Sequence, residues 1–178
     1  MITVISGTNR QDSRTLLFAV HFADQLRALG QEVQLLDLAE LRHDLFPKEM
    51  YEAGAIAPEL LDLQERFVLG AEKFAIFVPE YNGSYPGILK LFIDGISVNE
   101  YGRNFKGKHV ALVGIASGRA GNLRGMDHLG ACVNHMGGWV LPNKLPLSSV
   151  EKMLEGGELT DKATIKALKT HAEELIAA

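Results

Sequence analysis

The chain has 178 residues, 47% of them hydrophobic and 22% charged, which is typical of a folded protein with one sizeable core and excludes a disordered segment. Lys and Arg number 18 against 22 Asp and Glu, and the net charge of −4 argues against a broad nucleic-acid-binding surface, because such surfaces are basic. The one cysteine, Cys132, cannot form an internal disulfide, and the sequence shows neither a membrane-length apolar run nor a signal peptide. These features predict a cytoplasmic protein.

Short β-branched or apolar runs alternate along the chain with segments whose apolar residues recur every three or four positions. They predict strands over residues 2–6, 32–37, 73–79, 108–116 and 139–141, and helices over 13–29, 59–70, 86–98, 123–136 and 160–176. Ser13 is expected to cap the first helix, and Asp161 is expected in the first turn of the last one. Residues 38–58 have no clean period and are predicted to form a long connection, which in a compact domain is often functional.

The alternation of five strands with five helices predicts an α/β protein with a doubly wound parallel sheet between two layers of helices. We take residues 1–178 as a single domain, since the chain has no repeat and no low-complexity linker. In such sheets, ligands bind beyond the carboxyl ends of the strands, where the strand order reverses. For a five-stranded sheet of order 2-1-3-4-5, we therefore expect functional residues after the first, third and fourth strands.

The loop after the first predicted strand combines hydroxyl and guanidinium groups with the start of a helix. It contains Thr8, Arg10, Ser13, Arg14 and Thr15. A helix N-terminus offers unpaired amides and partial positive charge, hydroxyls donate hydrogen bonds, and arginine neutralises an anion, so this composition suits a phosphate. Neither a GxxxxGK[ST] nor a GxGxxG motif is present, which disfavours a P-loop nucleotide or NAD bound in Rossmann mode. A capped helix with a polar loop remains the structural alternative.

The loop after the third predicted strand, residues 79–87, holds two tyrosines, an asparagine and two glycines. Its backbone can approach a planar ligand closely, a tyrosine can face a heteroaromatic ring, and Asn82 can pair with a donor and acceptor edge. The alternative is a turn followed by a helix that starts at Pro86. From residue types alone, that alternative is the simpler interpretation.

The loop after the fourth predicted strand contains small residues, among them Ser117 and Gly118, that would let the backbone form the other wall of a ring site. An ordinary turn would also explain them. The location of all three loops at one edge of the predicted sheet favours a single binding site over three unrelated turns.

These motifs resemble those of the NADPH-dependent FMN reductase family of flavodoxin-like proteins, which includes quinone, azo-dye and chromate reductases. The resemblance runs from Ile2 to about Pro142. GTNRxxSxT resembles the family's GSxRxxSxN phosphate loop, PEYNGSYPGILK its PEYNxSxPGxLK flavin loop, and FKGKHVALVGIASGRAGNLR its FxGKxVxLVxxSxGxxGGxR segment. The chain departs from these patterns at Thr15 (usually asparagine), Ala116 (commonly serine) and Asn122 (usually the second glycine).

The resemblance implies a flavodoxin-like fold, FMN and NADPH as cofactors, and a small electron acceptor such as a flavin, quinone or dye. It implies FMN phosphate contacts at Thr8, Arg10, Ser13 and Thr15, and isoalloxazine contacts at Pro79, Glu80, Tyr81, Asn82 and Ser84. Reasoning from residue types adds Arg14, Gly83, Ser117 and Gly118 to the candidate cofactor-binding set. We expect no catalytic side chain, because the cofactors carry hydride transfer while the protein orients them and excludes water. The family also tends to form homodimers and homotetramers.

Two other functional classes remain open from the sequence: an electron carrier that binds flavin without a nicotinamide site, and a non-catalytic binding module. His128 and Cys132 lie four residues apart, as a thiolate–imidazole pair would, but a solvent-facing histidine and a buried cysteine are the simpler interpretation. The six histidines lack metal-ligand spacing, so we expect no metal site.

Overall fold

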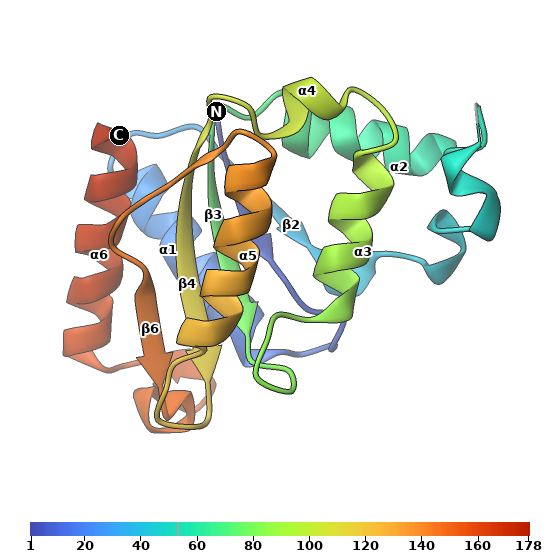
Figure 1. Ribbon diagram of the computed structural model, residues 1–178. Coiled ribbons are helices and arrows are strands. Elements are labelled where there is room, and N and C mark those ends of the chain that lie inside the picture. The colour runs from blue at the N-terminus through green and yellow to red at the C-terminus, as the bar shows by residue number, and fades with distance from the viewer. Residues whose placement is uncertain (53) are drawn as a thin grey trace.

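The computed structural model describes residues 1–52 and 54–178 and has a parallel β-sheet between two layers of helices (Figure 1). The main sheet contains β1 (Ile2–Ser6), β2 (Val33–Asp37), β3 (Lys73–Pro79), β4 (His109–Ala116), β5 (Trp139–Val140) and β6 (Leu145–Ser148), while β7 (Leu154–Glu155) and β8 (Glu158–Leu159) form a separate hairpin. The α-helices are α1 (Arg14–Ala28), α2 (Pro58–Leu63), α3 (Gly87–Ile96), α4 (Tyr101–Asn104), α5 (Leu123–His135) and α6 (Lys162–Ala177). The strand order β2-β1-β3-β4-β5 confirms the predicted flavodoxin-like α/β/α arrangement.

Helices cover both faces of the sheet and bury a separate apolar cluster on each (Figure 1). Phe18 and Phe22 of α1 pack with Leu168 of α6 on one face, whereas Leu60 of α2 and Phe92 of α3 belong to the cluster on the other. Because both faces are covered, the central strands β3 and β4 are apolar along almost their whole length and do not alternate with polar residues.

The outer edge of β4 carries two short strands where the sequence predicts one. β5 pairs with the start of β4, and β6 pairs with residues 113–116 near its end. Pro142 lies in the gap between them, and Pro146, which has no backbone N–H to donate, is accommodated because β6 is an edge strand. As a result, the chain reaches the carboxyl edge of the sheet again at residues 149–153, after it has done so at the ends of β1, β2, β3 and β4.

The long connection after β2 contains three short 3-10 turns, η1 (Leu38–Glu40), η2 (His43–Leu45) and η3 (Lys48–Tyr51). The predicted helix over residues 59–70 is an α-helix that continues as a π-helix, η4 (Gln64–Leu69). The short α4 is not among the helices expected from the sequence. Asp161 was expected in the first turn of the last helix, but it lies just before that turn. It is the N-cap of α6, and its side chain accepts a hydrogen bond of 2.7 Å from the amide of Thr164.

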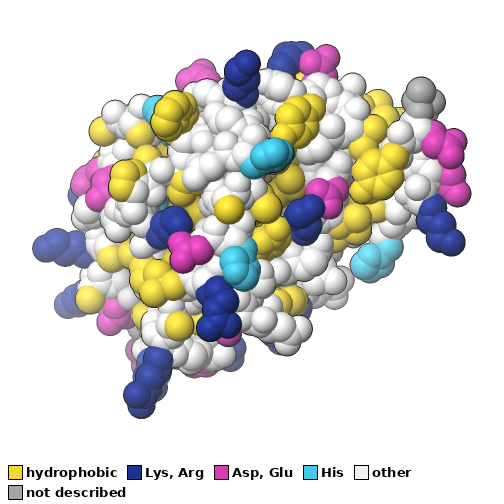
Figure 2. Space-filling view, viewed as in Figure 1, with side chains coloured by type: hydrophobic (Ala, Val, Ile, Leu, Met, Phe, Trp, Pro, Cys, Tyr) yellow, Lys and Arg dark blue, Asp and Glu magenta, His cyan; other side chains and the backbone are white. Residues whose placement is uncertain are grey.

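Across residues 1–52 and 54–178, no helix has both the length and the apolar character needed to cross a membrane. On the face of the molecule formed by α3 and α5, Figure 2 shows acidic and basic side chains interspersed, with apolar side chains between them. The strands run toward the lower edge in Figure 1, so the carboxyl ends of β1, β3 and β4 meet there. This edge positions the candidate site.

Candidate functional site

A cleft of about 360 Å³ lies at the carboxyl edge of the sheet. Its walls come from the loops after β1, β3 and β4 and from the segment after β6. They consist of Thr8, Arg10, Gln11, Asp12, Ser13, Arg14, Thr15, Pro79, Glu80, Tyr81, Ile115, Ala116, Ser117, Gly118, Val150 and Glu151. All but three of the predicted cofactor-binding residues line this cleft. The structure therefore brings together residues that are more than 100 positions apart in the sequence.

The three predicted residues outside the cleft wall, Asn82, Gly83 and Ser84, form a tight turn. Tyr81 and Ser84 exchange two backbone hydrogen bonds of 3.0 Å across it. Asn82 and Gly83 between them have φ values of 51° and 74°, the paired left-handed conformation for which the sequence Asn-Gly is favoured. The backbone conformation thus explains these two residue types without a ligand. The Asn82 side chain is exposed at the tip of the turn.

The first turn of α1 opens into the cleft. Ser13 is the N-cap, as predicted, and its Oγ accepts a hydrogen bond of 3.2 Å from the amide of Leu16. The amides of Arg14 and Thr15 come at the start of the helix, where no preceding turn supplies a carbonyl. Among the described residues, neither amide has a protein acceptor. Two directed donors and the positive end of the helix dipole are therefore available at this end of the cleft.

A direct side-chain contact fixes the loop after β1 against the loop after β3. The Thr8 Oγ1 and the Tyr81 hydroxyl lie 2.7 Å apart, and Thr8 is only 1% exposed. The amide of the preceding Gly7 donates to the carbonyl of Phe77, and a Cβ at Gly7 would come within 2.8 Å of that same oxygen. The absence of a side chain at Gly7 therefore lets β1 and β3 end side by side with their loops in contact.

The cleft carries both signs of charge. Arg10 and Arg14 face it together with Asp12, Glu80 and Glu151. Arg14 Nη1 lies 3.0 Å from Glu151 Oε1, whereas Arg10 has no ion-pair partner within the described part of the chain. Both arginines were expected at the site from the sequence, but Glu151 was not. Glu151 is 137 residues away from Arg14, and no local motif indicates their contact.

Asn122 connects the loop after β4 to the end of β3. Its Nδ2 donates to the carbonyl of Val78 at 2.9 Å, and its Oδ1 accepts from the amide of Gly125 at 3.1 Å as the N-cap of α5. Asn122 is 1% exposed and has a φ of 57°, a left-handed conformation that asparagine tolerates better than most residues. These two hydrogen bonds give a structural reason for asparagine at position 122, where the family pattern usually has glycine.

We expect Asn122→Ala to lower the free energy of unfolding by about 3 kcal/mol, because it removes a helix cap and a buried hydrogen bond to the Val78 carbonyl and strains the left-handed backbone. Chemical denaturation measures this loss. Asn122→Asp is the comparison variant: it keeps the cap acceptor but replaces the donor by a buried carboxylate oxygen that faces the Val78 carbonyl, so it should not restore the stability of the wild type. A stability of the alanine variant equal to that of the wild type would show that Asn122 does not hold the loop.

Successive residues of the loop after β3 contact one side of α5. Ser84 Oγ lies 2.9 Å from His128 Nδ1, and the Tyr85 hydroxyl lies 3.4 Å from Cys132 Sγ. His128 is exposed, as expected, and Cys132 is half-buried. The pKa of the Tyr85 hydroxyl is raised above its usual value, mainly by burial and secondly by the hydrogen bond to Cys132. The contacts of the histidine and the cysteine therefore attach this loop to α5.

The cleft residues fit a phosphorylated planar ligand such as FMN. At one end, the Ser13 and Thr15 hydroxyls, the open amides of α1 and the Arg10 guanidinium provide donors for a phosphate. Further along, Tyr81 and residues 115–118 provide walls from two different loops. Within the described residues, no group of three or more metal-ligating side chains could hold a metal ion.

The fold and the cleft define a flavodoxin-like α/β protein with a candidate nucleotide site at the carboxyl edge of its sheet. The sequence model of NADPH-dependent FMN reductases matches residues 1–152, so the chain belongs to the NADPH-dependent FMN reductase family. This result confirms the resemblance found in the sequence. The chain is an enzyme of that family, and its cofactors are FMN and NADPH.

Individual relatives cover nearly the whole chain. It is 28% identical to an NADPH azoreductase of Bacillus sp. strain OY1-2, over 96% of this chain and 91% of that protein. It is also 28% identical to an NAD(P)H-dependent FMN reductase of Pseudomonas aeruginosa, over 97% of this chain and 86% of that protein. Among solved structures, the flavoenzyme NAD(P)H:(acceptor) oxidoreductase FerB of Paracoccus denitrificans superposes with a TM-score of 0.76 at 26% identity, covering 99% of this chain and 94% of that one.

Proposed function

We propose that this enzyme transfers reducing equivalents from NADPH, through FMN held in the cleft, to a small acceptor such as a free flavin, a quinone or an azo dye. The observation that carries the proposal is the cleft itself, where the loops after β1, β3 and β4 meet at the edge of the sheet. The relatives named as an azoreductase, an FMN reductase and an NAD(P)H:(acceptor) oxidoreductase support this range of acceptors.

In this proposal, the first-strand loop binds the phosphate of FMN. Arg10 supplies charge, and Thr8, Ser13, Arg14 and Thr15 supply hydroxyl, guanidinium or amide donors. This end of the cleft would fix the position of the flavin along the edge of the sheet.

The other two loops would hold the flavin ring. Pro79, Glu80 and Tyr81 would line one side, and Ser117 and Gly118 the other. The turn formed by Asn82, Gly83 and Ser84 would keep Tyr81 in place through its two backbone hydrogen bonds. FMN, when bound, supplies the hydride chemistry, so these residues need only orient the ring and exclude water.

The arrangement requires no acid, base or nucleophile from the protein. We therefore assign no catalytic side chain, and we propose that the nicotinamide and the acceptor use the same side of the flavin in turn. We further propose that residues 1–178 form one FMN-binding domain, that the enzyme is a homodimer or homotetramer, and that it acts in the cytoplasm.

A steady-state assay of NADPH and NADH oxidation, with and without added FMN, tests the proposed reaction. A benzoquinone, an azo dye and free FMN serve as acceptors, and light scattering gives the oligomeric state. We expect FMN-dependent turnover with at least one acceptor and a preference for NADPH. Protein that binds FMN but does not oxidise either nicotinamide cofactor with any acceptor would contradict the proposal.

A further inference from the structure

The segment after β6 is built into the candidate phosphate end of the cleft. The amide of Ser149 donates to the carbonyl of Gly118 at 3.2 Å, and Ser148 Oγ donates to the carbonyl of Arg119 at 2.6 Å. Val150, which follows, is only 2% exposed. These contacts fix the start of the short 3-10 helix η5 (Val150–Met153) against the loop after β4, and with it the position of Glu151.

Glu151 places a carboxylate on one of the two arginines of the cleft. Its Oε1 lies 3.0 Å from Arg14 Nη1, and the two side chains are 40% and 55% exposed. Solvent-exposed ion pairs of this kind add little to stability, because water screens the charges and both side chains lose conformational freedom. Because both residues face the cleft, the main effect of the pair is on the charge there: Glu151 offsets the positive charge that Arg14 presents to a ligand.

The cleft is lined by more negative than positive side chains, which disfavours tight binding of a phosphate. Asp12, Glu80 and Glu151 give three carboxylates against the two guanidinium groups of Arg10 and Arg14. A phosphate monoester carries about −1.5 to −2 charges at neutral pH, so a carboxylate beside it is repulsive. Of the three carboxylates, only Glu151 forms an ion pair with a cleft arginine among the described residues.

We propose that Glu151 competes with the flavin phosphate for Arg14 and so keeps FMN exchangeable in the cleft. This inference rests on the proposed function, because it takes the first-strand loop as the phosphate site. Binding of FMN requires Arg14 to share or give up its bond to the Glu151 carboxylate. Riboflavin has no phosphate and gains nothing from Arg14, so Glu151 affects the two flavins differently.

Quenching of flavin fluorescence gives the test, with the dissociation constants of FMN and riboflavin measured for each variant. Glu151→Gln keeps the shape of the side chain and removes its charge. We expect it to tighten FMN binding about fivefold or more, to slow FMN release, and to leave riboflavin affinity unchanged. Glu173→Gln is the matched control: it removes one negative charge from an exposed ion pair with Lys169 on α6, outside the cleft, and should change neither affinity.

Arg14→Ala, made in both backgrounds, tests whether the effect passes through Arg14. With Glu151 present, Arg14 must give up its bond to the carboxylate to reach the phosphate, so its loss should weaken FMN binding less than in the Glu151→Gln background. In that background the same substitution should weaken FMN binding about fivefold or more. Equal effects of Arg14→Ala in the two backgrounds would overturn the proposal.

Two further results separate this inference from the proposed function. If the wild type binds FMN and Glu151→Gln binds it equally or less tightly, the hypothesis that Glu151 competes for Arg14 is wrong. The proposal that the cleft binds FMN is not affected by that result. An equal gain in riboflavin affinity would also overturn it, because the phosphate would then not be involved. Wild-type protein that binds neither flavin would overturn the proposed function and this inference together.

Discussion

Replacement of Arg10 by alanine is expected to weaken FMN binding about 20-fold and to change riboflavin binding by less than about twofold, since only FMN carries a phosphate for a charge-assisted hydrogen bond. Arg10 faces the cleft and has no ion-pair partner among the described residues, so its full charge is available to a ligand. Its exposed side chain makes no hydrogen bond that the fold requires, and the stability of the variant should equal that of the wild type. Flavin fluorescence titration measures both affinities.

Arg103→Ala provides the control for this substitution. Arg103 is an exposed arginine on α4, at the opposite end of the sheet, where it pairs with Glu100. Its loss changes the net charge by the same amount without touching the cleft, so FMN affinity should not change. Equal weakening by the two substitutions would mean that net charge, and not a contact in the cleft, controls flavin affinity.

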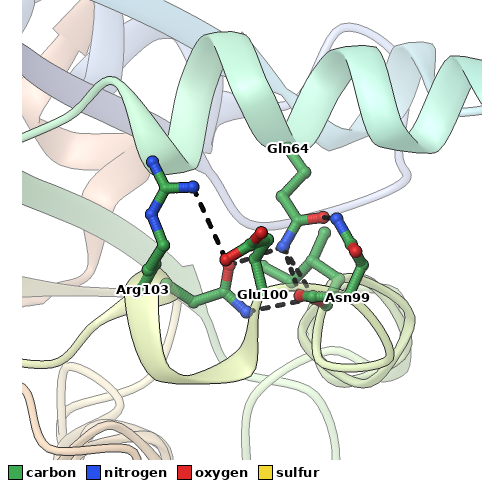
Figure 3. A network of polar contacts seen from close by, with 6 residues as sticks. Gln64, Asn99, Glu100 and Arg103 are labelled. Carbon is green, nitrogen blue, oxygen red and sulfur yellow. Dashed lines mark hydrogen bonds and ion pairs between the residues drawn. The ribbon is translucent and has the colours of Figure 1, made fainter.

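The second large effect is expected at Gln64, the centre of a buried polar network between η4 and the segment after α3 (Figure 3). Its Nε2 lies 2.8 Å from the carbonyl of Ile96, 2.7 Å from that of Asn99 and 2.7 Å from Asn104 Oδ1. Both Gln64 and Asn104 are fully buried. Gln64→Leu keeps a similar volume but removes the donor from Asn104 Oδ1 and from the Asn99 carbonyl, while the Ile96 carbonyl keeps its bond from Asn104 Nδ2. The substitution should lower the free energy of unfolding by about 4 kcal/mol.

Denaturant unfolding measures that loss, and Gln34→Leu is its matched control. Gln34 also donates two hydrogen bonds, to Thr3 Oγ1 and to the carbonyl of Arg66. Its side chain is only half-buried, so water can replace the exposed bond to Arg66, and Thr3 Oγ1 keeps its bond to the carbonyl of Phe67. We expect its replacement to cost less than about 1 kcal/mol. An equal loss in the free energy of unfolding for the two variants would show that the buried hydrogen bonds of Gln64 contribute no more to stability than the more exposed ones of Gln34. FMN affinity should be unchanged in both, because neither residue lines the cleft.

Much of the fold is predictable from the sequence because its elements are locally encoded. The β-branched run of β1 and the apolar runs of β3 and β4 are typical of strands buried on both faces, and the spacing of apolar residues in α1, α3 and α5 matches the helical period. Once strands and helices alternate, the right-handed crossover rule leaves few arrangements of the sheet. The strand order then brings the three predicted loops to one edge.

The part of the site after β6 could not be predicted, because it depends on pairing between distant segments. Residues 145–148 read Leu-Pro-Leu-Ser, with a proline and no strand-like alternation, and they form a strand only because the edge of β4 is available. That pairing carries Val150 and Glu151 to the cleft. The contact between Glu151 and Arg14 therefore forms only once the chain has folded, and neither segment predicts it from its own sequence.

The turn at Asn82 and Gly83 shows the opposite case, in which a local signal has a local cause. Asn82 was expected to pair with the edge of a ligand, but Asn-Gly is also the sequence that a two-residue turn with left-handed backbone favours. The structure has that turn, closed by the backbone of Tyr81 and Ser84. In this turn, Tyr81 is the only one of the four residues that faces the cleft.

A crystal structure of the enzyme with FMN tests the central claim most directly. We predict that the phosphate lies against Arg10, Ser13 and the open amides of α1, and that the ring lies between Tyr81 and residues 115–118. Flavin bound at another surface, with this cleft empty, would contradict the account.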